Sequence, residues 1–151
     1  MFTWYLVLKY IHIFSAIVAV GSNITYAVWS VRAQGEPSHF AFAFKGIKFI
    51  DDRLANPAYG VLFLTGLIMV FAGNWGFKLW VVAAIVLFVA VAAIGFGYFT
   101  PLLRNQIKLA EAGETSSPEF ERGLRRNQVI GPLLGVLVAI ILVLMVFKPT
   151  L

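Results

Sequence analysis

Residues 4–29 read WYLVLKYIHIFSAIVAVGSNITYAVW, and this stretch decides the fold. It is long enough to cross a bilayer as a helix, because a hydrocarbon core of ~30 Å takes about 20 apolar residues. The same stretch nevertheless contains Lys9, His12 and Asn23. A polar group that finds no partner in lipid costs free energy, so we expect these side chains to face protein, a cofactor or water.

The polar residues of this stretch share one side of the predicted helix. At about 100° per residue, one face collects polar and small side chains and the opposite face collects aliphatic ones. We therefore expect the first face to pack inside the protein and the second to contact lipid. The inward face comprises Tyr5, His12, Ala19, Asn23, Tyr26 and Ser30, and the lipid face comprises Leu6, Ile13, Ile17, Val20, Ile24 and Val28.

Composition favours the same class of protein. Of the 151 residues, 60% are hydrophobic and 13% are charged, whereas soluble domains carry about 25% charged residues. The net charge of +5 comes from basic residues that flank apolar runs, which favours contact with anionic lipid headgroups over nucleic acid. The chain has no cysteine, which excludes disulfides, iron–sulfur clusters and thiolate metal sites.

Four apolar runs predict an all-α fold, an integral membrane four-helix bundle that forms a single membrane domain over residues 1–151. Two long polar connections carry helical signals of their own, so we expect them to form cytoplasmic helical extensions. The spans cover about 4–30, 57–72, 79–100 and 129–147, and the connections cover 31–56 and 102–128.

Local signals predict where several helices begin and end. Asn56-Pro57 and Ser117-Pro118 each combine a capping residue with a proline at the first helical position, which is typical of a helix start. Gly113 predicts a helix end. Nine of the twelve Lys and Arg residues lie in the two long connections, which predicts that both connections are cytoplasmic and both termini outside.

His12 is the sharpest candidate for chemistry, because it is the only histidine inside a predicted span. An imidazole there suits ligation of haem iron or another metal, or a proton relay, and a hydrogen bond to a neighbouring helix is the alternative. Lys78, at the start of the third span, suits either headgroup contact or the binding of an anionic ligand group such as a propionate. Asn23 and Tyr26 share the face of His12. Polar contacts with the second or third span are the default interpretation of both residues, and as the alternative they complete the predicted cofactor site.

The acidic residues all lie outside the predicted spans. A carboxylate relay for protons or cations through the membrane therefore lacks its usual parts. The acids are Glu36, Asp51, Asp52, Glu111, Glu114, Glu119 and Glu121.

Several short motifs occur in a familiar order. They are LKYIHIFSAIVAVGSNITYAVW at 8–29, Asn56-Pro57, the stretch 75–79, PLLR at 101–104 and MVFKP at 145–149. In this order the chain resembles, over essentially its whole length, the uncharacterised bacterial integral-membrane family Domain of Unknown Function 2269. The resemblance implies four helices, a place in the bacterial inner cell membrane and no assigned activity.

More distantly, the first span is similar to membrane protoporphyrinogen oxidases of the HemJ type and to the copper-resistance D group. In the HemJ type, a histidine in the first span and a lysine that opens the third are functional, which implies roles for His12 and Lys78. The chain departs from that type at 24–35, where it reads ITYAVWSVRAQG.

Three functional hypotheses follow from these observations. The first is a membrane protein that binds haem b or a porphyrin through His12, for electron transfer or porphyrin handling. The second is a non-enzymatic structural or accessory subunit, in which the polar face of the first span packs against other helices, a second copy or a partner membrane subunit. The third is a small transporter.

Overall fold

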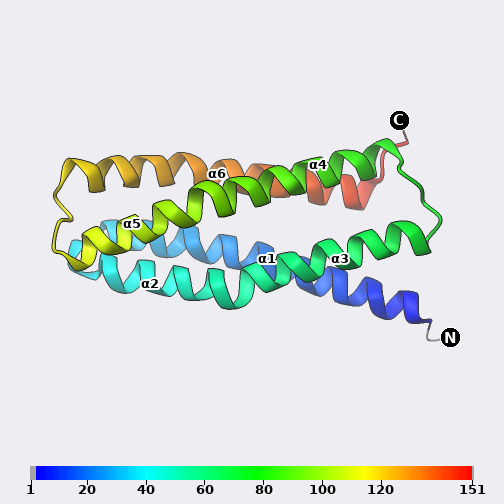
Figure 1. Cartoon of the computed structure of the whole chain (residues 1–151), viewed down its shortest axis with the longest axis horizontal. Helices are drawn as coiled ribbons and strands as arrows, with labels where there is room; N and C mark the ends of the chain where they lie inside the picture. The colour runs from blue at the N-terminus through cyan, green and yellow to red at the C-terminus, as the bar shows by residue number, and fades with distance from the viewer. Residues whose placement is uncertain (1–2, 151) are drawn as a thin grey trace.

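The computed structural model describes residues 3–150, which form four long helices that lie side by side along the molecule (Figure 1). The predicted all-α four-helix fold is confirmed. The turn η1 is a short 3₁₀ turn, and η2 and η3 are π-helical turns within longer helices. The first helix is α1 Trp4–Gln34; the second joins η1 Pro37–His39, α2 Phe40–Ile50, η2 Asp51–Ala55 and α3 Asn56–Ala72; the third joins α4 Leu79–Ile94, η3 Gly95–Phe99 and α5 Thr100–Glu111; the fourth is α6 Pro118–Phe147.

The helices form two pairs. Helix α1 packs along α3, and α4 packs along α6, while α2 packs against α1 and α5. Figure 1 shows α1 and α3 together in the lower part of the view and α4 and α6 in the upper part. We call the end where α1 begins and α6 ends the terminal end, and the end that holds the turns at 35–36 and 112–117 the connection end.

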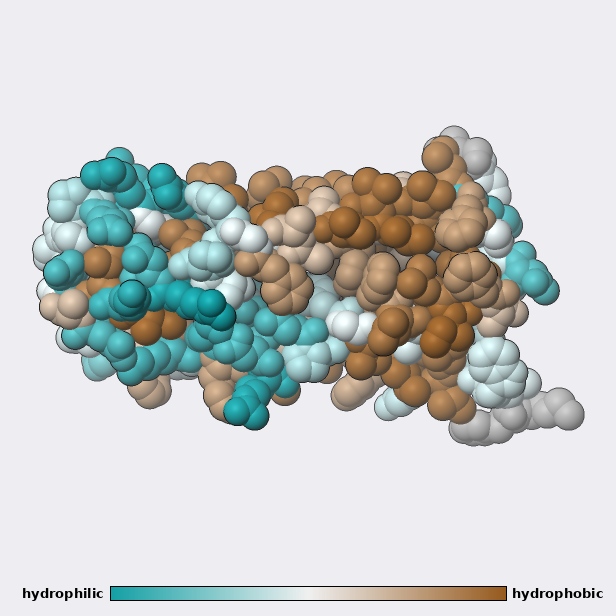
Figure 2. Space-filling view, viewed as in Figure 1, coloured by the Kyte–Doolittle hydropathy of each residue, from teal (hydrophilic) through white to brown (hydrophobic). Residues whose placement is uncertain are grey.

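All four long helices are long and apolar enough to cross a membrane. The 31 residues of α1 cover ~46 Å at ~1.5 Å per residue, which exceeds a hydrocarbon core of ~30 Å. Figure 2 shows hydrophobic residues over the terminal half and hydrophilic residues at the connection end. The excess length therefore projects from the membrane at the connection end, as helical extensions. The side of the membrane on which they lie stays a prediction.

A compact core holds the connection end together. Phe44 and Phe120 are fully buried there and Phe40 is buried, and the rings of Phe40 and Phe120 lie edge to face at 4.9 Å. A smaller core at the terminal end contains Trp80 and Val81. The two cores fix the ends of the bundle, and the helix pairs are less closely packed between them.

Most of the predicted helix ends are confirmed. The hydroxyl of Ser117 accepts a hydrogen bond from the backbone N–H of Phe120 at 3.2 Å, so Ser117 caps α6. Gly113 follows α5 with a φ of 73°, a left-handed conformation that glycine adopts without a side-chain clash.

The predicted helix start at Asn56-Pro57 is wrong. The helix runs continuously from α2 through η2 into α3, and no side chain caps α3. In a straight α-helix the ring of Pro57 would clash with the carbonyl of the residue four positions earlier. The π turn η2 ends at Ala55, two residues before the proline, and its wider backbone accommodates the ring. Pro101 follows η3 in the same way.

The predicted faces of α1 are largely confirmed. Ser15, Ala19, Ser22 and Tyr26 are buried on the inward side. The exposed residues of the opposite side include Leu6, Ile13, Ile17, Ile24 and Val28. The inward polar side chains of α1 are therefore surrounded by protein, which can supply the hydrogen-bond partners that lipid cannot.

Candidate functional site

A cavity of about 640 Å³ lies between the two helix pairs. Its size is within the range of small-molecule sites. Most of its lining is apolar, and polar side chains gather toward the connection end. The polar lining residues are Asn23, Tyr26, Ser30, Gln34, Asp51, Asn56, Tyr59, Thr100, Asn127 and Gln128.

Asp51 is the centre of the polar end. Its Oδ1 accepts a hydrogen bond from the Tyr26 hydroxyl at 3.2 Å, and its Oδ2 accepts from Asn56 Nδ2 and from the Thr100 hydroxyl, each at 3.5 Å. These donors come from α1, the start of α3 and the start of α5. One carboxyl group therefore links three of the four long helices at one level of the bundle.

The two π turns place these groups together. Asp51 is the first residue of η2, and Thr100 directly follows η3. A π turn carries one more residue per turn than an α-helix needs, so it changes which side chain faces inward. Such turns occur frequently at functional sites, and here two of them border the same cavity.

Asp51 is buried without an ion-pair partner among residues 3–150. The side chain is 6% exposed, and the nearby Lys48 binds the adjacent Asp52 instead. Asp51 lies six residues before the expected apolar span 57–72, on the part of the second long helix that leads to the hydrophilic connection end. Burial raises the pKa of the Asp51 carboxyl, while the hydrogen bond from Tyr26 acts in the opposite direction.

Two further polar links border the cavity. Asn23 Nδ2 donates to the Tyr59 hydroxyl at 2.7 Å, which joins α1 to α3. Asn127 Nδ2 donates to the Ser30 hydroxyl at 3.4 Å, which joins α6 to α1. The lining includes no Lys, Arg or His, so Asp51 is its only group with a formal charge when ionised.

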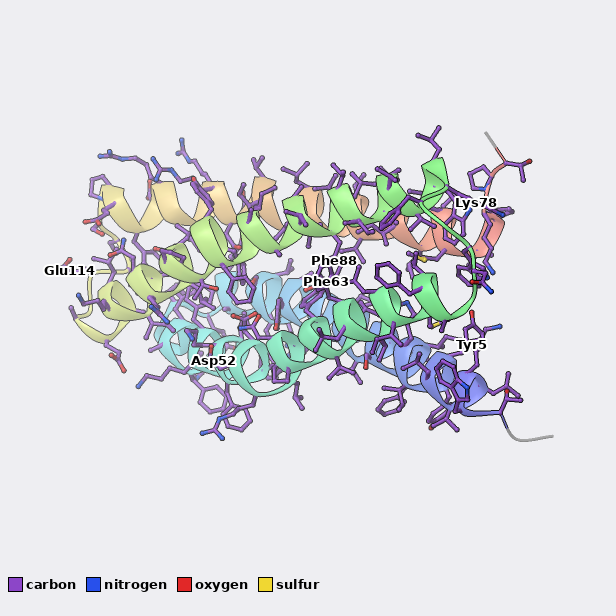
Figure 3. The ribbon with its side chains drawn as sticks, turned by 45° about the vertical axis from the view of Figure 1, so that its right-hand side comes forward. Tyr5, Asp52, Phe63, Lys78, Phe88 and Glu114 are labelled. Carbon is purple, nitrogen blue, oxygen red and sulfur yellow. The ribbon has the colours of Figure 1, made fainter. Side chains whose placement is uncertain are left out.

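Aromatic rings form much of the wall. The rings of Tyr26 and Phe99 stack at 5.9 Å beside Asp51. Deeper in the cavity Phe63 stacks on Phe88 at 5.3 Å, and Figure 3 shows these two rings meeting between α3 and α4. Tyr59 meets Phe88 edge to face at 6.0 Å. The aromatic rings thus continue from the polar end into the apolar part.

Helix α6 supplies a wall with open space in front of it. Gly131 and Gly135 line the cavity, and a Cβ atom added to either would meet nothing within 4 Å. The lining residues Ile24 of α1 and Leu142 of α6 are also exposed on the molecular surface. The cavity is therefore open to the molecular surface, and exposed lining residues lie on α1 and α6.

The four predicted site residues separate into two groups. Asn23 and Tyr26 line the cavity with Asp51, whereas His12 and Lys78 do not. Lys78 is exposed at the beginning of α4, in the other helix pair from His12. The structure does not bring His12 and Lys78 into contact.

His12 instead lies between α1 and α3. Its Nδ1 is 2.9 Å from the hydroxyl of Thr65, and its ring lies against Gly66, where an added Cβ would come within 3.0 Å of Cε1. The Thr65 hydroxyl donates its proton to the carbonyl of Val61 at 2.7 Å. The carbonyl of Leu62 is a second acceptor at 3.1 Å. With its proton on either carbonyl, the Thr65 hydroxyl accepts a hydrogen bond from His12 Nδ1–H, and in this tautomer the lone pair lies on Nε2.

A haem group would fit this surrounding only in part. The lone pair on Nε2 suits an axial ligand, because a ligating histidine usually donates a hydrogen bond from its other nitrogen. The cavity does not reach His12, however, and its lining has no basic residue for a propionate. Residues 3–150 contain no group of three or more His, Cys, Asp or Glu side chains that could hold a metal ion. Haem or porphyrin binding stays a prediction.

Sequence reasoning missed Asp51 because it assigned the residue to a connection. A signal was present, however. Phe40, Phe44, Ile47 and Asp51 follow one another at helical spacing, and all four are buried. A carboxylate that continues the apolar face of a helix indicates a buried acid.

The chain matches the family model described as predicted integral membrane protein (DUF2269) over residues 6–149. The chain belongs to this family. Its description gives a location in the membrane and no activity, so the resemblance found in the sequence is confirmed at that level. The more distant similarity to the HemJ type stays a prediction. The chain matches no curated protein and no solved structure.

Proposed function

We propose that this protein binds an amphipathic molecule dissolved in the membrane, and that the cavity between the helix pairs is the binding site. One observation carries the proposal: a single cavity combines apolar and aromatic walls with a cluster of polar side chains at one end. An amphipathic molecule places its apolar part against the walls and its polar head among Asn23, Tyr26 and Asp51. Its entry route is the open side of the cavity, where exposed lining residues lie on α1 and α6.

The distribution of basic residues supports an orientation for this site. Nine of the twelve basic residues lie toward the connection end, which supports a cytoplasmic location for that end and an outside location for the termini. The polar head then lies at the cytoplasmic boundary of the bacterial inner membrane. Because the chain has no cysteine, single cysteines at Asn74 and Gly113 test this directly. Only the cysteine at 74 should react with an impermeant maleimide in intact cells.

Photolabelling tests the binding site. We expect a long-chain alcohol that carries a diazirine to label cavity residues of α1 and α6 in the detergent-purified protein. Gly135→Leu fills the open space in front of α6 and should abolish labelling of the cavity residues. Gly21→Leu is the matched control, because Gly21 also has open space but lies outside the cavity. Uniform labelling of all exposed residues, unchanged by Gly135→Leu, would contradict the proposal.

Haem or porphyrin binding through His12 is a second candidate, and the lone pair on Nε2 is the observation that favours it. Its test is an absorption spectrum of the purified protein after haem is supplied. A Soret band that is lost in His12→Ala supports it, and the absence of a band in the wild type sinks it.

The accessory-subunit alternative is supported by the use of the α1 polar face for hydrogen bonds between helices. It predicts that a stoichiometric membrane partner or a second copy purifies with the chain.

A further inference from the structure

We propose that the polar end of the cavity binds a lipophilic organic cation, with the Asp51 carboxylate as its counter-ion and the neighbouring aromatic rings as its walls. This inference rests on the proposed binding function and names the chemical class of the ligand.

Charge is the first argument. Asp51 is buried, and the three groups that donate to it are a phenol, an amide and a hydroxyl, all of them neutral. The nearest lysine on the same helix, Lys48, is paired with Asp52. A buried carboxylate is ordinarily neutralised by a cationic partner or by a proton. The cavity lining contains no cationic side chain that could neutralise Asp51. A bound cation would neutralise this carboxylate, whereas an anionic head group would not.

The aromatic walls are the second argument. Tyr26 and Phe99 stack on each other next to Asp51, and Tyr59 and Phe88 follow deeper in the cavity. The face of an aromatic ring attracts a cation, and cages of such rings are used to recognise quaternary ammonium groups. A carboxylate combined with several rings therefore favours a large organic cation with spread charge over a small, strongly hydrated ion.

The apolar part of the cavity restricts the chemical class of the ligand further. The walls toward the terminal end are aliphatic and aromatic, and the exposed lining residues lie on α1 and α6. A ligand must be soluble in the membrane to enter there, so the cation must carry substantial apolar surface. A bare metal ion is disfavoured because residues 3–150 provide no cluster of ligating side chains around Asp51.

Competition with protons follows from this arrangement. A proton and the organic cation neutralise the same carboxylate, so affinity for the cation should increase with pH by up to about tenfold per unit until Asp51 is ionised. The titratable groups that face Asp51 are Lys48 and Asp52 on its own helix, Tyr26 from α1 and Tyr59 from α3. The groups that α5 and α6 add to the lining are neutral, so Asp51 dominates the pH dependence.

Equilibrium dialysis of the detergent-purified full chain with radiolabelled tetraphenylphosphonium tests the inference. We expect Asp51→Asn to weaken binding at least tenfold near pH 8, and Asp51→Glu, which keeps the charge, to bind within about threefold of the wild type. Asp52→Asn is the matched control, because it removes a neighbouring carboxylate that is exposed and paired with Lys48. Triphenylphosphine oxide, a neutral molecule of similar shape, should bind equally to the wild type and Asp51→Asn.

The outcomes separate this inference from the proposed function. Equal binding of tetraphenylphosphonium to the wild type and Asp51→Asn overturns the role of Asp51. An affinity of the wild type that does not fall when the pH is lowered below 3.8, the ordinary pKa of an aspartate, overturns it too, and this measurement needs no variant to fold. If the diazirine alcohol still labels the cavity in those cases, only the cationic class is wrong. If Gly135→Leu changes the binding of none of the probes, the proposed binding site is wrong as well.

Discussion

The two helix pairs are held together by different forces. Between α1 and the helix that contains α3, three side-chain hydrogen bonds cross the interface: His12 to Thr65, Asn23 to Tyr59 and Tyr26 to Asp51. In the second pair, the side-chain hydrogen bonds found among residues 3–150 lie only at the connection end, where Asn105 and Gln106 of α5 donate to Glu119 and to the carbonyl of Phe120. Helix α4 itself packs on α6 through apolar side chains. The mean hydropathies of the helices agree with this difference between the pairs. They are 1.6 and 1.7 for the apolar windows of the first pair, and 2.8 and 3.0 for those of the second.

The difference shows how each pair acquires its register in lipid. Apolar side chains gain little by leaving lipid for another helix, so packing and hydrogen bonds decide which helices associate. Spaced polar bonds fix α1 against α3 at several heights. No residue in the apolar window of α6 is buried, so this helix relies on the contacts at its two ends. The cavity therefore lies between a pair joined by polar bonds and a pair with a lipid-exposed wall.

Gly123→Leu should have the largest effect, because it breaks the contact that holds α6 at the connection end. A Cβ at Gly123 would lie 2.5 Å from the side chain of Gln106, which is 2% exposed and donates to the carbonyl of Phe120. We expect a loss of about 1–3 kcal/mol from overpacking. Thermal unfolding in detergent measures it, and hydrogen exchange should show lost protection in α6 before α1.

Two variants complete this test. Gly131→Leu, on the same helix but with open space in front of it, should change stability by less than about 0.5 kcal/mol. Gln106→Ala should restore part of the stability of Gly123→Leu, because it removes the side chain that the leucine meets. Equal effects of leucine at 123 and 131 would show that the connection end does not hold α6.

Phe88→Leu should have the next largest effect, because Phe88 joins the two pairs. Its ring stacks on Phe63 and meets Tyr59 edge to face. Aromatic pairs contribute about 0.5–1.5 kcal/mol beyond the area they bury, so we expect a loss in that range in thermal unfolding. Phe49→Leu, at an exposed position of α2, is the control and should be nearly neutral. The opposite order would mean that the pairs do not depend on this bridge.

Thr65→Val tests the polar bonds of the first pair. It keeps the shape of the side chain and removes the acceptor for His12, so we expect a loss of about 0.6 kcal/mol, the average for hydrogen bonds between membrane helices. Thr25→Val is closely matched, because the Thr25 hydroxyl donates only to Gly21 of its own helix. Thermal unfolding of the two variants should differ by the value of the interhelical bond, and identical curves would remove the distinction between the pairs.

The sequence predicted the features that depend on local periodicity and missed those that depend on which helices pack against each other. The inward face of α1 and the cap at Ser117 follow from spacing and from the chemistry of one side chain. The pairing of α1 with α3 is a tertiary choice, and for that reason the hydrogen bond of His12 to Thr65 could not be read from the sequence. Asp51 was missed because the helix continues through Pro57, and the π turn that permits this has no simple sequence signature.

Asp51→Asn should have the smallest effect on stability. Asp51 belongs to the first helix pair and accepts a hydrogen bond from Thr100 of the second pair. Asparagine keeps one oxygen that accepts from Tyr26, but its Nδ2 cannot accept from Asn56 and Thr100, so the change removes the charge together with these two long hydrogen bonds. Burial raises the pKa of Asp51 above its ordinary value of 3.8, so its contribution to stability is complete below that value and is lost as pH rises through the raised pKa. The melting temperature of Asp51→Asn should therefore gain on the wild type as the pH rises above 3.8 and through the raised pKa of Asp51. A constant difference across this range would mean that the carboxyl titrates alike in the folded and unfolded chain, and the cavity would then contain an ordinary hydrated acid in place of a buried one.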